Sequence, residues 1–138
     1  MAADPQHELL KGIQAKWNAT AAISAIGALH RWDAPPNKTQ RPYVVIRDEP
    51  ATDAGMTAVS QLFDHSLEFR VHHESPALAS VEVAKIDQVF SSDSLSLTLS
   101  GISLVSCRLV RPTYEQLDDG IWYAGLGYRL QTSRARIA

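Results

Sequence analysis

The five histidines are the residues of this chain best suited to metal binding or proton transfer, yet their spacing favours neither. His72 and His73 are adjacent in a segment with strand-like alternation, so their side chains point to opposite faces. His65 precedes His72 by seven residues, which places them about 23 Å apart along an extended strand. No Cys-x-x-Cys, His-Glu-x-x-His or carboxylate loop has metal-binding spacing. We expect structural histidines and no metal.

A nucleophilic or phosphate-binding site has no better support. Cys107, the single cysteine, lies between Val105 and Leu109 on the apolar side of a predicted strand, where a thiol acts as a small hydrophobe. No serine stands in a Gly-x-Ser-x-Gly elbow. Gly125-Leu126-Gly127 lies within a strand pattern, which predicts close packing of the backbone against a neighbour. Asp118-Asp119 is better explained as part of a turn than as a functional pair of carboxylates. The sequence therefore predicts neither an enzyme nor a cofactor.

Two amphipathic helices carry the clearest signals. Asp4-Pro5 and Ser75-Pro76 each combine an N-cap residue with a proline suited to the first turn. Apolar residues follow both pairs at helical spacing. In the first helix they are Leu9, Leu10, Ile13 and Trp17, and in the second they are Ala79, Val83, Ile86 and Phe90.

Four segments read as strands. Residues 43–47 are aromatic and β-branched, and residues 66–72 alternate with Leu67, Phe69 and Val71 on the apolar face. Residues 102–111 form a third strand that we expect Pro112 to end. Asp118-Asp119-Gly120 predicts a hairpin turn before a last strand over residues 122–130. One core is expected to contain Leu67, Phe69, Val71, Val83, Ile86, Phe90, Val105, Leu109 and Tyr128.

The predicted fold class is α+β. Residues 1–138 make a single domain with an antiparallel sheet of four to five strands and two helices on one face. Residues 30–42 read as a connection. Residues 48–64 show neither helical nor strand periodicity and predict a long loop between the first two strands. Residues 132–138 are expected to be an exposed tail.

Composition is that of an ordinary soluble domain, with 45% hydrophobic and 20% charged residues. The net charge of −2 argues against dedicated binding to the DNA backbone. No apolar stretch approaches the roughly 20 residues of a membrane span, and the first residues lack the pattern of a signal peptide. A single cysteine favours a reducing, intracellular origin.

The order of elements resembles a phage protein family. The resemblance is carried by Arg41–Ile46, Leu67–Val71, Ser75-Pro76, Asp118–Tyr123 and Gly127–Leu130. Over residues 5–131 the chain is similar to the tail-completion or tail-terminator proteins of long-tailed phages, which also occur in prophages and gene transfer agents. Periodicity by itself leads only to α+β.

What the resemblance implies is structural. Such proteins form a homohexameric ring at the head-proximal end of the tail tube, stop tube growth and present a surface to the head-tail connector or stopper protein. DNA passes through the lumen without specific binding, and no membrane is involved. The expected location is the virion tail, with the cytoplasm of the bacterial host during assembly. The alternatives are a neck stopper or other head-tail joining subunit and, less favoured, a small enzyme or ligand-binding domain that uses His65, Glu68 or His72.

The assembly interface is predicted within residues 48–64, which are acidic and carry several apolar anchors. Such a loop cannot offset its own ordering entropy until the anchors are buried against the tail tube protein or a neighbouring subunit. A surface insertion without a role is the plain alternative. The expected interface residues are Asp48, Glu49, Asp53, Met56, Val59, Leu62, Phe63, Asp64, Asp118 and Asp119.

Overall fold

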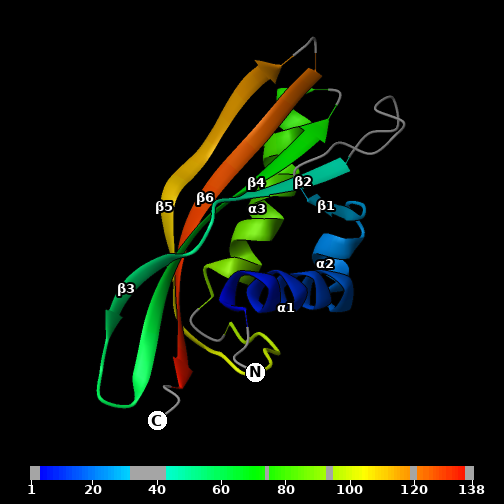
Figure 1. The fold of residues 1–138 in the computed structure, drawn as a ribbon. Coiled ribbons are helices and arrows are strands. Elements are labelled where there is room, and N and C mark those ends of the chain that lie inside the picture. The colour runs from blue at the N-terminus through cyan, green and yellow to red at the C-terminus, as the bar shows by residue number, and fades with distance from the viewer. Residues whose placement is uncertain (1–3, 32–42, 74, 93–94, 119–120, 136–138) are drawn as a thin grey trace.

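The computed structural model describes residues 4–31, 43–73, 75–92, 95–118 and 121–135 (Figure 1). Three helices and six strands follow one another along these residues. They are α1 (Pro5–Ala19), α2 (Ala21–Ser24), β1 (Leu29–Arg31), β2 (Tyr43–Asp48), β3 (Thr52–Met56), β4 (Ser60–His73), α3 (Pro76–Phe90), β5 (Ser103–Asp118) and β6 (Ile121–Ala135).

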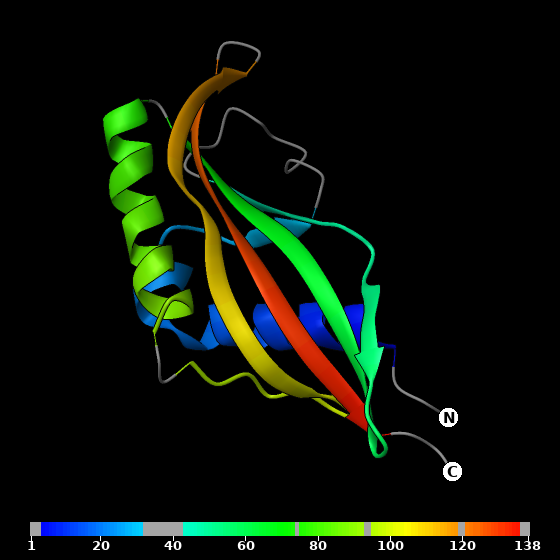
Figure 2. The same ribbon diagram turned by 90° about the vertical axis from the view of Figure 1, so that its left-hand side faces the viewer.

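The six strands form a single sheet in the order β1-β2-β4-β6-β5, and β3 pairs with the part of β4 that β2 does not reach. Only β1 and β2 pair in parallel; the other pairs are antiparallel. The sheet is strongly twisted, and the helices lie on one of its faces (Figure 2). The α+β class and the one-sided helical layer are therefore confirmed, with more strands than the sequence predicts and a short additional helix, α2.

Both predicted helix starts are confirmed. The Asp4 carboxylate accepts hydrogen bonds from the backbone N–H groups of Gln6 and His7, and the Ser75 hydroxyl accepts one from Leu78. These bonds satisfy N–H groups that have no partner within the helix. No helix in the described ranges has the length and apolarity needed to cross a membrane.

The core lies between the sheet and the helices and is centred on Phe69. Its ring packs on Trp17, Phe90 and Tyr128 with centroid distances of 6.1, 4.9 and 6.1 Å. Seven of the nine predicted core residues are buried here, including all those from β4, α3 and β6. Val105 and Leu109 are the exceptions, with 51% and 36% of their surface exposed.

Irregular pairing of β5 explains these two errors. The β5–β6 register shifts between Leu104 and Ser106, between Leu109 and Arg111, and between Arg111 and Tyr114. A bulge adds a residue and re-aims the side chains around it. Val105 is the extra residue of the first shift and faces solvent, whereas Leu109 opposes the buried Tyr128 but lies on an edge strand.

Three predicted boundaries are also wrong. Pro112 does not end β5, because it falls within a bulge of an edge strand, where its missing N–H is tolerated. Thr132 is fully buried, because β6 continues to Ala135 where a tail is predicted. Within the connection predicted over 30–42, His30 and Arg31 belong to β1, and residues 32–42 lie outside the described ranges.

The loop predicted over residues 48–64 is likewise wrong, because it is a β-hairpin. Asp48 ends β2, β3 follows, and β4 begins at Ser60, six residues before the predicted strand. Alternation is lost in β3 because Gly55 has a φ of 125° and the register shifts between Asp53 and Gly55. A bulged strand of this kind leaves no period in the sequence.

Candidate interaction surfaces

The first surface is the hairpin arm, which we define as β3, the turn after it and residues 60–64 of β4. It extends past the helical layer at one end of the sheet (Figure 1). At its tip, Met56 and Val59 are 57% and 73% exposed. Large apolar side chains at such a position suit contact with another protein.

The tip of the arm is held by local hydrogen bonds. The Asp53 carboxylate accepts from the Gly55 N–H at 2.9 Å. The Thr57 hydroxyl accepts from the Ser60 N–H at 2.9 Å, and the Thr57 N–H donates to the Ser60 carbonyl at 2.8 Å. Side-chain bonds of this type are typical of ordered turns. The arm therefore presents its apolar tip in a defined conformation.

A series of hydrogen-bonded polar side chains, of which Asp48, His65 and Thr132 are buried, anchors the base of the arm. The His65 ring lies between the Thr132 hydroxyl, 2.7 Å from Nε2, and Gln6 Oε1, 2.9 Å from Nδ1. Gln6 Nε2 donates to Asp48 at 2.6 Å, and Arg31 donates twice to the same carboxylate at 2.9 Å. These hydrogen bonds thus connect β1, β2, α1, β4 and β6.

The direction of each hydrogen bond follows from the Asp48 carboxylate. A carboxylate only accepts, so the Gln6 amide must turn its NH₂ toward Asp48 and its oxygen toward His65. The His65 Nδ1 then carries the proton, and Nε2 accepts from the Thr132 hydroxyl. Burial lowers the pKa of His65, an effect partly offset by the Asp64 carboxylate, and so favours the neutral ring.

His65 is hydrogen-bonded to the hydroxyl of Thr132, as a general base is to the nucleophile of a catalytic site, but both groups are buried. His65 and Thr132 are 1% and 0% exposed. A general base must come within about 3 Å of the proton that it abstracts from a substrate. The hydrogen bonds of His65 to Thr132 and Gln6 therefore position the arm and do not act on a substrate. A cavity of about 570 Å³ lies beside these side chains, and the residues around it include Asp4, Arg31 and Phe63.

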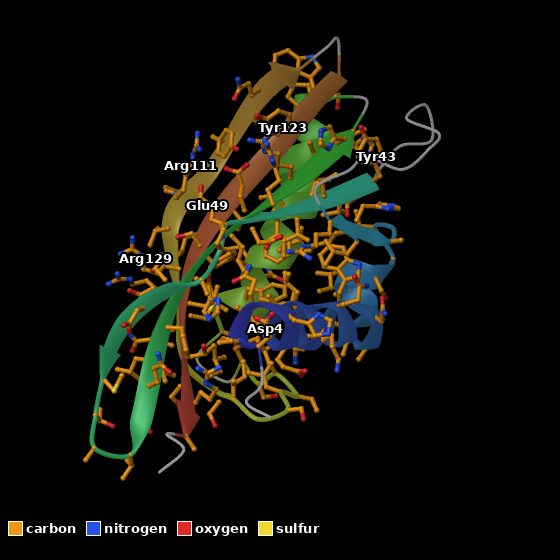
Figure 3. All side chains as sticks on the ribbon, viewed as in Figure 1. Asp4, Tyr43, Glu49, Arg111, Tyr123 and Arg129 are labelled. Atoms are coloured by element: carbon orange, nitrogen blue, oxygen red, sulfur yellow. The ribbon has the colours of Figure 1, made fainter. Side chains whose placement is uncertain are left out.

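The second surface is the face of the sheet opposite the helices. Tyr43, His72 and Tyr123 stack across β2, β4 and β6 with centroid distances of 4.6 and 5.3 Å. Tyr114 of β5 meets the Tyr123 ring edge-on at 6.0 Å. Of the side chains labelled in Figure 3, Tyr43 comes from β2, Tyr123 and Arg129 come from β6, and Arg111 comes from β5.

Arginines accompany the aromatic rings on this face. Arg70 lies over Tyr123 at 4.8 Å and Arg111 over Tyr114 at 3.9 Å, both within cation–π range. Glu68 forms ion pairs with both guanidinium groups. Burial, followed by the neighbouring Glu68, raises the pKa of Tyr114. A pocket of about 360 Å³ borders this cluster.

Arg108 and Arg129 lie directly opposite each other on β5 and β6, and both are exposed. The register places them on the same face as Arg70 and Arg111, because alternate residues of paired strands share a face. Nothing in the sequence pattern indicates this pairing, since it depends on the bulges of β5. Apolar and polar residues alternate over residues 66–72, with Glu68, Arg70 and His72 on one side. This alternation does predict a polar face.

The predicted interface residues are distributed unevenly. Glu49, Asp53, Met56 and Val59 are exposed, and Leu62, Phe63 and Asp64 are half-buried in the arm. Asp48 is 4% exposed and engaged by Arg31 and Gln6, so it serves the anchor. The backbone of Asp118 pairs with Ile121 at the end of β5–β6 far from the arm, and Asp119 lies outside the described residues.

Cys107 occupies a structural position. Its thiol donates to the Phe90 carbonyl at 3.4 Å, and burial raises its pKa to about 11. A thiol of this pKa is almost entirely protonated near neutral pH and is a poor nucleophile. Across the described ranges, no group of three or more His, Cys, Asp or Glu side chains could hold a metal ion.

Two of three comparisons place the chain among known proteins. A family model described as tail completion protein gp17 matches residues 11–127. A chain in a solved structure, "Virion of native gene transfer agent (GTA) particle", has the same fold, with a TM-score of 0.73 and 20% sequence identity over 93% of this chain and 96% of that chain. At this identity the likeness establishes the fold alone. No curated protein matches in sequence.

Proposed function

The chain belongs to the tail completion protein gp17 family, and on that premise we propose that it forms a homohexameric ring at the head-proximal end of a phage-type tail. The ring ends polymerisation of the tail tube and joins the tail to the head. The observation that carries this proposal is the family match, which runs from the middle of α1 to the middle of β6 and includes the whole of α3 and the whole arm.

The two surfaces suit a subunit that must contact several partners. The arm presents an apolar tip at one end of the sheet, whereas the opposite face presents the exposed guanidinium groups of Arg108, Arg111 and Arg129 beside largely buried rings. A ring subunit needs one contact with each neighbour and others with the tube below and the head connector or stopper above. DNA passes through the lumen without specific binding, consistent with a formal charge of −2 for each subunit.

Removing the chain from particle-forming cells tests the proposal. Without the chain we expect overlong tails or tails not joined to heads. In particles that contain the chain, averaged electron micrographs should show six copies of it. Tails of normal length that stay unjoined would instead assign the chain to the neck as a stopper. Normal, joined and infectious particles without the chain would contradict both roles.

A more focused test is to replace residues 51–61 with a short Gly-Ser linker. This change deletes β3 and the tip while leaving the core residues in place. We expect a folded domain, shown by cooperative unfolding, that fails to complete tails. Normal tail length and joining with this variant would reduce the arm to a spacer.

A further inference from the structure

Arg108 and Arg129 form a like-charge pair on adjacent strands. They are direct cross-strand partners, and neither makes an ion pair within the part of the chain that the structure describes. Like charges directly opposite each other in a sheet are destabilising. The nearby Arg70 and Arg111, by contrast, share Glu68. An external anionic group placed between Arg108 and Arg129 would remove this repulsion.

Exposed apolar side chains surround the pair, which indicates that its partner is a protein. The bulges of β5 turn Val105 and Val110 outward, and each is 51% exposed. A nucleic-acid backbone offers phosphates to the arginines but nothing apolar to the valines. A protein surface that combines carboxylates with apolar side chains can bind both the arginines and the valines.

The opposite edge of the same sheet has this composition. From Asp48 to Phe69 the sequence contains no lysine or arginine, and Glu49 and Asp53 are exposed there. Met56 and Val59 supply the apolar part at the tip of the arm. Figure 2 shows β3 and β5 at the two opposite edges of the sheet.

The register brings Glu49 level with Arg108 and places the row of Asp53 three residues farther along β4. The Glu49 N–H donates to the Ser66 carbonyl at 3.0 Å, Ser66 opposes Arg129, and Arg129 opposes Arg108. One row of the sheet thus begins with Glu49 and ends with Arg108. The row through Asp53 ends in the same way at Leu104, next to Val105.

We propose that the edge formed by Glu49 and the hairpin arm of one subunit binds the β5 edge of a second copy, with Glu49 facing the Arg108–Arg129 pair and Asp53 adding its charge from the row of Leu104. This inference rests on the proposed ring and identifies its subunit contact. Because the two edges differ, the contact is head-to-tail, and a heterologous contact of this kind generates a ring when its rotation closes.

Charge reversal in particle-forming cells that lack the native chain tests the contact. We expect Arg108→Glu/Arg129→Glu to reduce the yield of joined tails at least tenfold, and Glu49→Arg/Asp53→Arg to do the same. The four changes combined are expected to restore at least a third of the native yield, because each ion pair is rebuilt with its charges exchanged. The matched control, Lys11→Glu/Lys85→Glu, makes the same change in net charge on α1 and α3 and should leave the yield unchanged.

The outcomes separate this inference from the proposed function. If the native chain restores joined tails but reversal of Arg108 and Arg129 has no effect, the contact is wrong and the tail function stands. Normal joined tails that fail to deliver DNA would assign the arginines to DNA and overturn the contact. Failure of the fourfold variant to recover, although its unfolding midpoint matches that of the native chain, would overturn it as well.

Discussion

The ring of Tyr114 lies directly on Gly125 of the neighbouring strand. A Cβ atom at Gly125 would be 2.8 Å from both Cζ and the hydroxyl oxygen of Tyr114, closer than real contacts allow. The absence of a side chain at this position therefore lets the aromatic row of the open face continue from Tyr123 to Tyr114. Close packing of backbone against a neighbour is what the Gly125-Leu126-Gly127 pattern predicts, and it is confirmed.

Gly125→Ala should therefore destabilise the fold by about 1–3 kcal/mol through overpacking. Chemical unfolding measures this loss. Gly125→Ala/Tyr114→Ala should lose much less than the sum of its single changes, because removing the ring makes room for the methyl group. Additive losses would show that the two side chains do not compete for the same space.

Phe69→Ala should lower the free energy of unfolding by about 3–5 kcal/mol, because it leaves a cavity at the centre of the core. Val59→Ala, at a position 73% exposed, is the control and should change the free energy of unfolding by less than about 0.5 kcal/mol. A loss below about 1 kcal/mol for Phe69→Ala would contradict the register of β4.

Stability should fall as the solution is acidified through the range in which His65 titrates. Its folded-state pKa lies below the ordinary value of 6.5, so the unfolded chain binds more protons below that pH. The contribution is complete above about pH 6.5 and is lost toward lower pH, by at most about 1.4 kcal/mol per pH unit. In urea unfolding between pH 5 and pH 7.5, the free energy of unfolding should depend less steeply on pH for His65→Gln than for the native chain. Equal slopes would contradict burial of the neutral ring.

Asp48 and Asp53 provide a matched pair of acidic residues near the arm. Asp48→Ala should cost about 1–3 kcal/mol, because the Gln6 amide loses a buried acceptor and Arg31 loses its bidentate partner. Asp53→Ala should change the free energy of unfolding by less than about 1 kcal/mol, because its carboxylate is exposed and bonds only within its own turn. A reversed order, measured by unfolding, would contradict the anchoring role of Asp48.

Cys107 should react slowly with iodoacetamide at pH 8. A rise in pKa from 9 to about 11 reduces the thiolate fraction roughly a hundredfold, and the thiolate is the reactive form. The reaction in denaturant is the control and should proceed at the rate of a free thiol. Equal rates for folded and unfolded chains would show that the thiol is not shielded by α3.

The parts of the fold that can be read from the sequence are those governed by local signals. The helices α1 and α3 begin at an N-cap and a proline, and the alternation over residues 66–72 assigns Phe69 to the core. Burial of the apolar stripes follows from these signals because only one face of each element is apolar. The order of the elements also carries the family resemblance, which the match over residues 11–127 confirms.

The remaining features depend on contacts between distant segments. Asp48 reads as an exposed acid of a loop until β1 lies parallel to β2 and brings Arg31 to it. The arm shows no period because Gly55 introduces a bulge, and Val105 looks internal because nothing local indicates the shift in β5. The pairing of Arg108 with Arg129 follows from the two other shifts of β5, between Leu109 and Tyr114.

Strand β5 is sixteen residues long and lies at the edge of the sheet. A flat edge of this length could template strands from other chains, and the sheet would then grow into a fibre. Three breaks in register and a proline without an N–H interrupt the row of backbone donors along it. A neighbouring subunit must then bind this edge through side-chain contacts and not through a continuous row of backbone hydrogen bonds. Such contacts favour a closed assembly over open-ended growth. Under the proposed function, a subunit that ends one polymer is in this way kept from starting another.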